Sequence, residues 1–229
     1  MAVLLIDDHA DSLETIGILF QLAGVASVPC DDPLNAVGLA ELVQPDVCVV
    51  DVSMPGLDGL EVARRIASSP RIIKKPVMIA YTGRPDCQAE AFDSGYLVYL
   101  MKTSTPPDKL VDLVKAHIYR RQRDAVLATI QTDLRGQITQ WDEGAEQLYG
   151  WRGPEVLGKH ILNVTPSNAS RSEAADIMMR LSAGESWFGK FQVVKRSGEP
   201  MDVFVHDFPV RSKTGELAGI LGYSFMLQD

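Results

Sequence analysis

The first half of the chain alternates short apolar runs with segments of helical periodicity, and no other feature constrains the fold as strongly. Five runs have the length and residue types of strands: 3–6, 25–28, 47–50, 77–80 and 97–100. Between them, apolar residues recur at helical spacing over 16–23, 57–66 and 106–118. Strands interleaved with helices predict a five-stranded parallel sheet with helices on both faces, which is a doubly wound α/β domain.

The first of these helices carries a signal for its start. Asp11 and Glu14 have the spacing of a capping box, in which the two side chains satisfy free backbone N–H groups of the first turn. This spacing predicts that Asp11 caps the helix.

Ionisable and hydroxyl residues follow four of the five runs. Asp7 and Asp8 follow the first run, Asp51 the third, Thr82 the fourth and Lys102 the fifth. Chemistry in parallel sheets gathers at the carboxyl ends of the strands, so we expect these side chains to converge. Adjacent carboxylates repel unless a positive group lies between them. Because Mg²⁺ prefers oxygen ligands and often binds a phosphate, it is the expected partner.

Four stretches carry these residues in a characteristic order: "LLIDDHADS", "VCVVDVSMPGLDGLEVARRI", "PVMIAYTG" and "LVYLMK". In order and spacing they resemble the receiver domain of bacterial two-component response regulators. The resemblance covers residues 1–120 and implies a flavodoxin-like sheet.

The resemblance also implies roles for single residues. Asp51 would be the phospho-acceptor, attacking a phosphohistidine of a histidine kinase or phosphotransfer protein. Asp8 would bind Mg²⁺ directly and Asp7 through water, with Asp51 and the backbone carbonyl of Ser53 completing the protein ligands.

Three further residues match the part of the family that responds to the phosphoryl group. Thr82 and Lys102 would bind its oxygens, and Tyr99 would be the aromatic residue that turns inward when the threonine moves. One position departs from the family, which usually has a proline after the lysine, often across a cis bond. Here Thr103 follows, and a cis bond to a non-proline residue costs about 3 kcal/mol, so we expect that geometry to be lost.

The second half has a different pattern of short strands and irregular helices. The stretch "IQTDLRGQITQWDEGAEQLYGWRGPEVLGKHI", followed by hairpin strands split at "SGEP" and "SKTGE", resembles a PAS domain. The resemblance spans 126–229 and implies an α+β fold with an antiparallel sheet. Gly136 supplies the permissive backbone at the first turn.

The PAS ligand is left open by the sequence, although two cofactors are argued against. No cysteine follows Cys87, so we expect no covalent flavin. The two histidines of this half, His160 and His206, lie outside the helix that would carry a haem ligand, so we expect no haem. Trp141, Trp187 and Phe191 are more simply core aromatic residues than a flavin site.

A connector is predicted between the two domains. Residues 108–130 contain no helix breaker and could run as one helix from the receiver into the PAS domain. Its heptad pattern is weak, yet a homodimer through the connector and the PAS domain remains open.

Composition excludes several classes of protein. The net charge is −8, so binding to nucleic acid is not expected. The N-terminal residues lack the pattern of a signal peptide, so we expect none, and no apolar stretch of the sequence is long enough to span a membrane. Three cysteines without metal-site spacing fit a reducing cytoplasm.

These features predict a cytoplasmic response regulator whose phosphorylation on Asp51 alters a PAS module that dimerises, binds a partner or senses a ligand. No catalytic output motif follows, so we expect no enzymatic activity beyond self-phosphorylation and autodephosphorylation of the receiver. The alternative is a PAS-based ligand sensor, or a fragment of a larger kinase or cyclase, with the receiver mainly a docking domain. The cognate kinase, the output pathway and the oligomeric state are not encoded in recognisable form.

Overall fold

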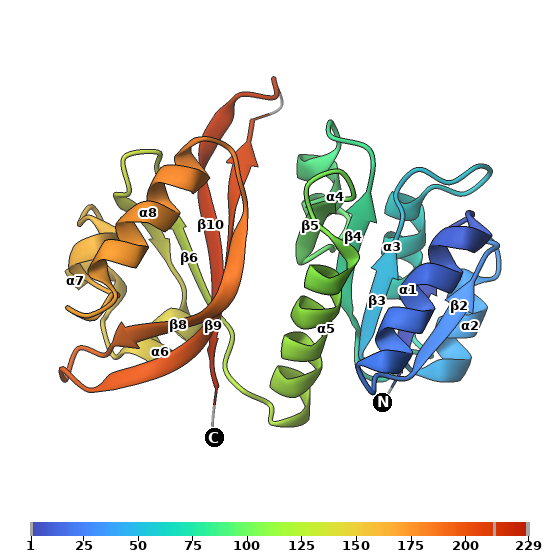
Figure 1. Cartoon of the computed structure of the whole chain (residues 1–229), viewed down its shortest axis with the longest axis horizontal. Helices are drawn as coiled ribbons and strands as arrows, with labels where there is room; N and C mark the ends of the chain where they lie inside the picture. The colour runs from blue at the N-terminus through green and yellow to red at the C-terminus, as the bar shows by residue number, and fades with distance from the viewer. Residues whose placement is uncertain (1, 213, 228–229) are drawn as a thin grey trace. The chain divides into compact units, whose positions relative to one another are not determined.

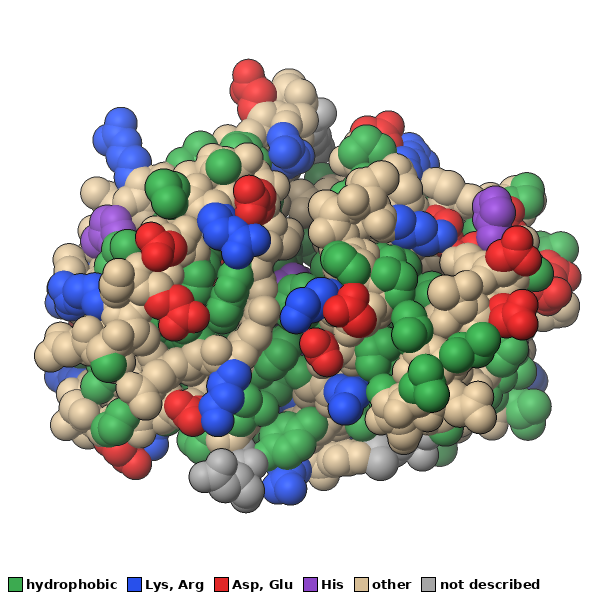
Figure 2. Space-filling model, viewed as in Figure 1, with side chains coloured by type: hydrophobic (Ala, Val, Ile, Leu, Met, Phe, Trp, Pro, Cys, Tyr) green, Lys and Arg blue, Asp and Glu red, His purple; other side chains and the backbone are tan. Residues whose placement is uncertain are grey.

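The computed structural model describes residues 2–212 and 214–227 and consists of two compact units, Met1–Arg121 and Gln122–Asp229 (Figure 1). Each unit has its own five-stranded sheet and its own hydrophobic core. Charged side chains of both signs are scattered over the visible face of each unit (Figure 2). Among the described residues, no helix is both long and apolar enough to cross a membrane.

The first unit is a parallel sheet with helices on both faces, as the sequence predicted. Its strands are β1 (Val3–Ile6), β2 (Ser27–Cys30), β3 (Val47–Val50), β4 (Val77–Thr82) and β5 (Val98–Met101). Its helices are α1 (Ala10–Leu22), α2 (Ala36–Val43), α3 (Gly59–Ser68), α4 (Gln88–Asp93) and α5 (Pro107–Gln122). The strand order is β2-β1-β3-β4-β5, and every pair is parallel.

Burial on both faces of this sheet confines its polar chemistry to one edge. Ile6 and Val50 pack in one core with Ala40 of α2 and Ile66 of α3. The intervening strand residues, such as Val49, are buried as well. The strand order changes direction between β1 and β3, and in open parallel sheets the crevice at the carboxyl ends of such strands is the usual ligand site.

The predicted capping box at the start of α1 is wrong. The helix begins at Ala10 with His9 as its N-cap residue, so Asp11 lies inside the first turn. The side chain that organises this turn is Asp7, whose Oδ1 accepts a hydrogen bond from the His9 N–H at 3.0 Å. Because Asp7 already satisfies the turn, the chain enters the helix before Asp11.

The loop after β5 has the geometry expected from its missing proline. No peptide bond among the described residues is cis, so the bond between Lys102 and Thr103 is trans. The Tyr81 hydroxyl donates a hydrogen bond of 2.9 Å to the Thr105 carbonyl and thereby ties this loop to β4.

The predicted continuous helix over 108–130 is also wrong. Helix α5 ends at Gln122, and Asp124 has a left-handed backbone with φ of 46°, which a right-handed helix does not accommodate. Strand β6 (Ala128–Thr132) follows, with alternate residues buried. The two-residue period of burial shows why this segment forms a strand despite lacking a helix breaker.

The second unit is an antiparallel sheet with helices, again as predicted. After β6 come β7 (Ile138–Trp141), β8 (Trp187–Val194), β9 (Pro200–Arg211) and β10 (Leu217–Met226), in the order β7-β6-β10-β9-β8. Its helices are α6 (Glu143–Tyr149), α7 (Gly153–Val156), the 3₁₀ helix η1 (Ile161–Asn163) and α8 (Arg171–Ser182). The turn between β6 and β7 requires Gly136, which has φ of 77°.

Candidate functional site

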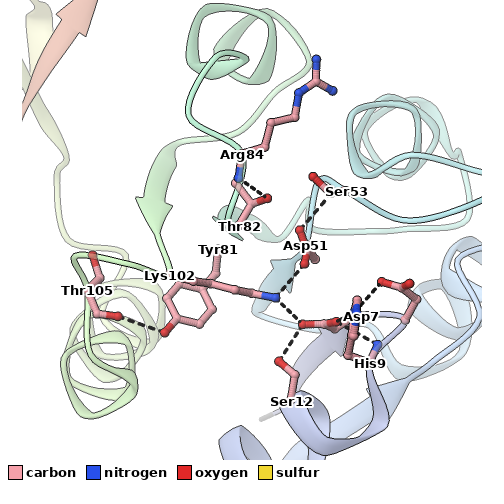
Figure 3. Close-up of polar contacts among 11 residues, drawn as sticks. Asp7, His9, Ser12, Asp51, Ser53, Tyr81, Thr82, Arg84, Lys102 and Thr105 are labelled. Carbon is pink, nitrogen blue, oxygen red and sulfur yellow. Dashed lines mark hydrogen bonds and ion pairs between the residues drawn. The ribbon is translucent and has the colours of Figure 1, made fainter.

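Three carboxylates and an imidazole gather at the carboxyl ends of β1 and β3. Asp7, Asp8 and His9 follow β1 directly, and Asp51 follows β3 (Figure 3). One potential ligand atom from each lies within 4.8 Å of the others. Asp7 and Asp51 are buried, whereas the His9 side chain is mostly exposed. Oxygen donors of this kind suit a hard divalent cation such as Mg²⁺.

Lys102, which follows β5, joins the two buried carboxylates of this cluster (Figure 3). Its Nζ lies 2.6 Å from Asp51 Oδ2 and 2.7 Å from Asp7 Oδ2. The other oxygen of Asp51 accepts a hydrogen bond of 2.9 Å from the Ser53 N–H. Asp51 is therefore held by both oxygens at a fixed orientation.

Asp7 and Lys102 are stabilised in their charged forms. Burial would raise the pKa of Asp7, but hydrogen bonds from Lys102, Ser12 and the His9 N–H outweigh it and hold the pKa below its usual value. Burial would lower the pKa of Lys102, yet the hydrogen bonds and charges of Asp51 and Asp7 raise it overall. The carboxylates still outnumber the ammonium, so the cluster has room for a further positive charge.

The backbone of Arg84 links Thr82 to Tyr99. The Thr82 hydroxyl oxygen accepts a hydrogen bond of 3.3 Å from the Arg84 N–H, and the Tyr99 hydroxyl donates to the Arg84 carbonyl. The Tyr99 hydroxyl also lies 3.1 Å from the Cys87 Sγ. Thr82 and Tyr99 are both buried, and one peptide segment, the backbone of Arg84, contacts both of their side chains.

Some contacts of the site were not predicted from the sequence. Ser12 donates a hydrogen bond of 2.7 Å to Asp7 Oδ2, and His9 Nδ1 lies 3.1 Å from Asp8 Oδ1. Tyr81 places its ring 5.9 Å below the Lys102 ammonium. His9 and Ser12 could have been predicted, because they stand beside Asp7 and Asp8 in the stretch "DDHADS". Arg84 contributes its backbone N–H and carbonyl, so its residue type gives no signal.

The second unit contains a cavity of about 80 Å³ between its sheet and its helices. The two histidines considered as haem ligands do not line it. His160 Nδ1 accepts a hydrogen bond of 3.2 Å from the Leu162 N–H, and the buried His206 ring packs against Phe188 and Phe208. The absence of haem stays a prediction.

Comparison with protein families identifies both units. Residues 3–115 match the model of the response regulator receiver domain, and residues 116–224 match the model of the PAS fold. The chain is therefore a receiver domain followed by a PAS domain, which confirms the predicted pair. This combination supports a place in two-component signalling.

Two of the curated relatives described next are named as transcriptional regulators. The transcriptional regulatory protein PdtaR of Mycobacterium tuberculosis is 38% identical over 109 residues, covering 48% of this chain and 47% of the relative. The DNA-binding dual master transcriptional regulator RpaA of Synechocystis is 28% identical over 161 residues, covering 69% and 66%. RcaC of Microchaete diplosiphon is 32% identical over 122 residues, covering 53% of this chain but only 18% of its own length. The chain spans less than two thirds of each of these relatives.

Solved structures similar to each unit are also known. The receiver domain of Francisella response regulator 1452 is 25% identical, covers 52% of this chain and 98% of its own, and has a TM-score of 0.48. A PAS domain from Colwellia psychrerythraea is 20% identical, covers 48% and 97%, and has a TM-score of 0.41. The fold assignment itself rests on the strand orders and the family models.

Proposed function

We propose that the receiver domain accepts a phosphoryl group on Asp51 from a phosphohistidine of a histidine kinase or phosphotransfer protein. The observation that carries this proposal is that both oxygens of Asp51 accept hydrogen bonds, one from Lys102 Nζ at 2.6 Å and the other from the Ser53 N–H at 2.9 Å. A buried carboxylate held at the crevice edge of a parallel sheet is a positioned nucleophile.

In the proposed reaction an Asp51 oxygen attacks the phosphorus of the phosphohistidine. The P–O bond forms as the P–N bond breaks, and the imidazole nitrogen of the donor keeps the electron pair and takes up a proton. Such transfers need positioning and charge stabilisation more than acid–base chemistry from the acceptor. Lys102 supplies a fixed positive charge beside the oxygens that become more negative.

The carboxylates of Asp7, Asp8 and Asp51 and the Ser53 carbonyl would hold Mg²⁺, with Asp7 acting through water. The donor set fits, because oxygen atoms from three acids lie together and the Lys102 ammonium balances only part of their charge. When bound, Mg²⁺ neutralises charge on the phosphoryl oxygens.

Thr82 and Tyr99 would carry the signal away from Asp51. If the Thr82 hydroxyl turns to a phosphoryl oxygen, it releases the Arg84 N–H that it now accepts from. The Arg84 carbonyl holds Tyr99, so movement of this peptide alters the packing of the aromatic ring. The switch would thus pass through the backbone of Arg84.

The acceptor is tested by intact-mass analysis of the full chain after incubation with acetyl phosphate and Mg²⁺. We expect the mass of one added phosphoryl group in the parent protein and none in Asp51→Asn. Asp112→Asn, an exposed aspartate on α5, is the matched control and should be modified like the parent. Modification of Asp51→Asn would refute the acceptor assignment.

We further propose that the PAS domain receives this signal by changing its association with a second copy or another protein. Light scattering after size exclusion, with and without beryllofluoride and Mg²⁺, measures the first route. A change in mass would show assembly driven from Asp51. Failure of the receiver to bind beryllofluoride would instead favour the alternative, a docking receiver joined to a ligand-sensing PAS domain.

A further inference from the structure

The cavity of the PAS domain has apolar walls that suit a small organic molecule. It lies between the sheet and helices α6 and α8, and its walls include Ile130, Ile177 and the aromatic pair Trp187 and Phe191. The two aromatic rings meet edge to face with centroids 5.9 Å apart. A volume of about 80 Å³ exceeds what one water needs and suits a ligand of about four non-hydrogen atoms.

Two polar side chains in this apolar wall have no hydrogen-bond or ion-pair partner among the described residues. The Thr132 hydroxyl lines the cavity, is 5% exposed as a residue, and has no hydrogen-bond partner in the described part of the chain. The Asp207 carboxylate also lines the cavity, and no hydrogen bond or ion pair to it is found among residues 2–212 and 214–227. An unpaired polar group inside a protein raises the free energy of the folded state. A ligand that hydrogen-bonds to such a group therefore gains more binding free energy than it would from the same contact in water.

The sheet register fixes how these two groups face each other. Asp207 of β9 lies opposite Gly222 of β10, and Thr132 of β6 lies opposite Ile220 of β10. All four residues are on the same face of the sheet. The Cα atoms of Asp207 and Thr132 are two strands apart and offset by two residues along the strands, or roughly 12 Å in all. A ligand that reaches both needs two polar ends a few ångströms apart.

Gly222 makes room for the carboxylate. A Cβ atom at this position would lie 2.3 Å from Asp207 Oδ1, so any larger residue would displace the acid. The aspartate therefore occupies the space above a glycine in the middle strand of the sheet.

We propose that the PAS cavity binds a small amino alcohol, with its ammonium group on Asp207 and its hydroxyl on Thr132. The carboxylate requires a positive partner, and none of the cavity-lining residues is basic. The Thr132 hydroxyl requires a donor or acceptor. The carbon atoms between the two ends would pack on Trp187 and the neighbouring apolar wall.

The ionisation of Asp207 agrees with this chemistry. Burial raises the pKa of Asp207 to about 7, so near neutral pH a cation can draw out the charged form. The other titratable residues lining the cavity are Tyr149 of α6 and Tyr223 of β10, and burial raises the pKa of both. Asp207 is therefore the group that responds near neutrality.

The test is an NMR titration of the full chain with three probes of equal size, at matched ionic strength. Ethanolamine carries both polar ends, ethylene glycol replaces the ammonium by a hydroxyl, and propylammonium lacks the hydroxyl. The signals followed are the Trp187 indole N–H and the Gly222 amide. We expect a dissociation constant on the order of millimolar for ethanolamine, as its size allows. The two other probes should bind at least about tenfold and about threefold more weakly, respectively.

Two isosteric variants and a control separate the two contacts. Asp207→Asn should remove the preference for ethanolamine over ethylene glycol, and Thr132→Val should remove the preference over propylammonium. Asp202→Asn is the control, because this aspartate of β9 pairs with Lys190 at 2.9 Å and does not line the cavity. From about pH 6 to about pH 8 ethanolamine binding should strengthen, except in Asp207→Asn.

Each failure has a defined meaning. Equal binding of the three probes to the parent protein, or no saturable binding of ethanolamine, would overturn the proposal without reference to any variant. So would Asp207→Asn that folds and keeps the full preference for ethanolamine. None of these measurements involves Asp51, so the phosphoryl-acceptor proposal stands or falls separately.

Discussion

The two domains place a carboxylate in opposite electrostatic environments. In the receiver, Asp7 and Asp51 share the Lys102 ammonium at 2.7 and 2.6 Å. In the PAS domain, Asp207 has no ion-pair or hydrogen-bond partner within the described residues. The consequences follow in the pKa values: that of Asp7 lies below its usual value, whereas burial raises that of Asp207 to about 7.

This difference separates a site that carries its own counter-charge from a site that depends on a ligand for it. The receiver can keep its buried acids charged in the folded state, because the Lys102 ammonium stabilises them. The PAS cavity contains a carboxyl group that has no counter-charge among the described residues, so occupancy by a cation would stabilise its charged form. Breaking each arrangement should therefore have effects of opposite sign.

The largest effect is expected from Lys102→Met, which removes the counter-charge from Asp7 and Asp51. Breaking a buried ion pair typically costs 3–5 kcal/mol, and because the Lys102 side chain is 26% exposed we expect about 3 kcal/mol. Urea unfolding followed by far-UV circular dichroism measures the change. Added Mg²⁺ should restore part of the loss by replacing the missing charge.

Two references make this measurement specific. Lys109→Met removes an exposed lysine that lies 3.7 Å from Asp112, and it should change stability by less than about 1 kcal/mol. The three tryptophans, Trp141, Trp151 and Trp187, all belong to the PAS domain, so their fluorescence should be unaffected by Lys102→Met. Equal stability of Lys102→Met and the parent would show that the acids do not need the lysine.

Asp207→Asn should act in the opposite direction, and its effect should depend on pH. The pKa of Asp207 is about 7 when folded against an ordinary value of 3.8, so between these values the folded state holds a proton that the unfolded state has lost. Raising the pH through this window therefore removes stability from the parent protein. A pKa difference of about three corresponds to about 4 kcal/mol of unfolding free energy. Because Asp207 is only partly shielded from solvent, we expect a loss of about 2 kcal/mol.

Tryptophan fluorescence in urea at about pH 5 and about pH 8 reports this change for the PAS domain alone. We expect Asp207→Asn to be more stable than the parent at the higher pH and to lose that advantage at the lower pH. The same difference at both pH values would mean that Asp207 does not titrate on folding.

Much of the fold followed from periodicity, because long-range packing here agrees with local pattern. The runs 3–6 and 47–50 were predicted with the bounds they have in β1 and β3. The segment 108–130 failed for a physical reason: lack of a helix breaker permits a helix but does not require one. Pairing of β6 with β10 decided the outcome, and no local signal encodes that pairing.

The residues of the receiver site could be predicted from the sequence more completely than those of the PAS cavity. Asp7, Asp51 and Lys102 each follow a strand, so topology alone brings them together, while their chemical roles remain proposals. Asp207 lies in "VFVHDF", where residues on both faces of the strand are largely apolar. Nothing in that stretch tells which face meets the helices, and His206, the residue of this stretch that was weighed as a haem ligand, does not line the cavity.

A smaller effect is expected from a hydroxyl pair beside the same cavity. The Tyr149 and Ser224 hydroxyls lie 2.8 Å apart and are both buried. Tyr149→Phe removes the bond and leaves Ser224 without this partner, so the PAS domain should lose about 1 kcal/mol. Fluorescence-detected unfolding measures it, and combining the change with Ser224→Ala should give less than the sum of the two single losses.

The smallest effect is expected from Thr132→Val, which should stabilise the PAS domain, whereas Tyr149→Phe should destabilise it. Its buried hydroxyl has no hydrogen-bond partner in the part of the chain that the structure describes. Replacing it by a methyl group of similar shape therefore removes a desolvation cost without removing a bond. Without ligand, the PAS domain should gain roughly 0.5–1 kcal/mol by the same fluorescence assay. Thr129→Val, on the same strand but facing away from Thr132, should change little. A loss of stability in Thr132→Val would mean that ordered water already hydrogen-bonds to the hydroxyl. Asp207 would then be the one polar group of the two in this wall without a partner among the described residues.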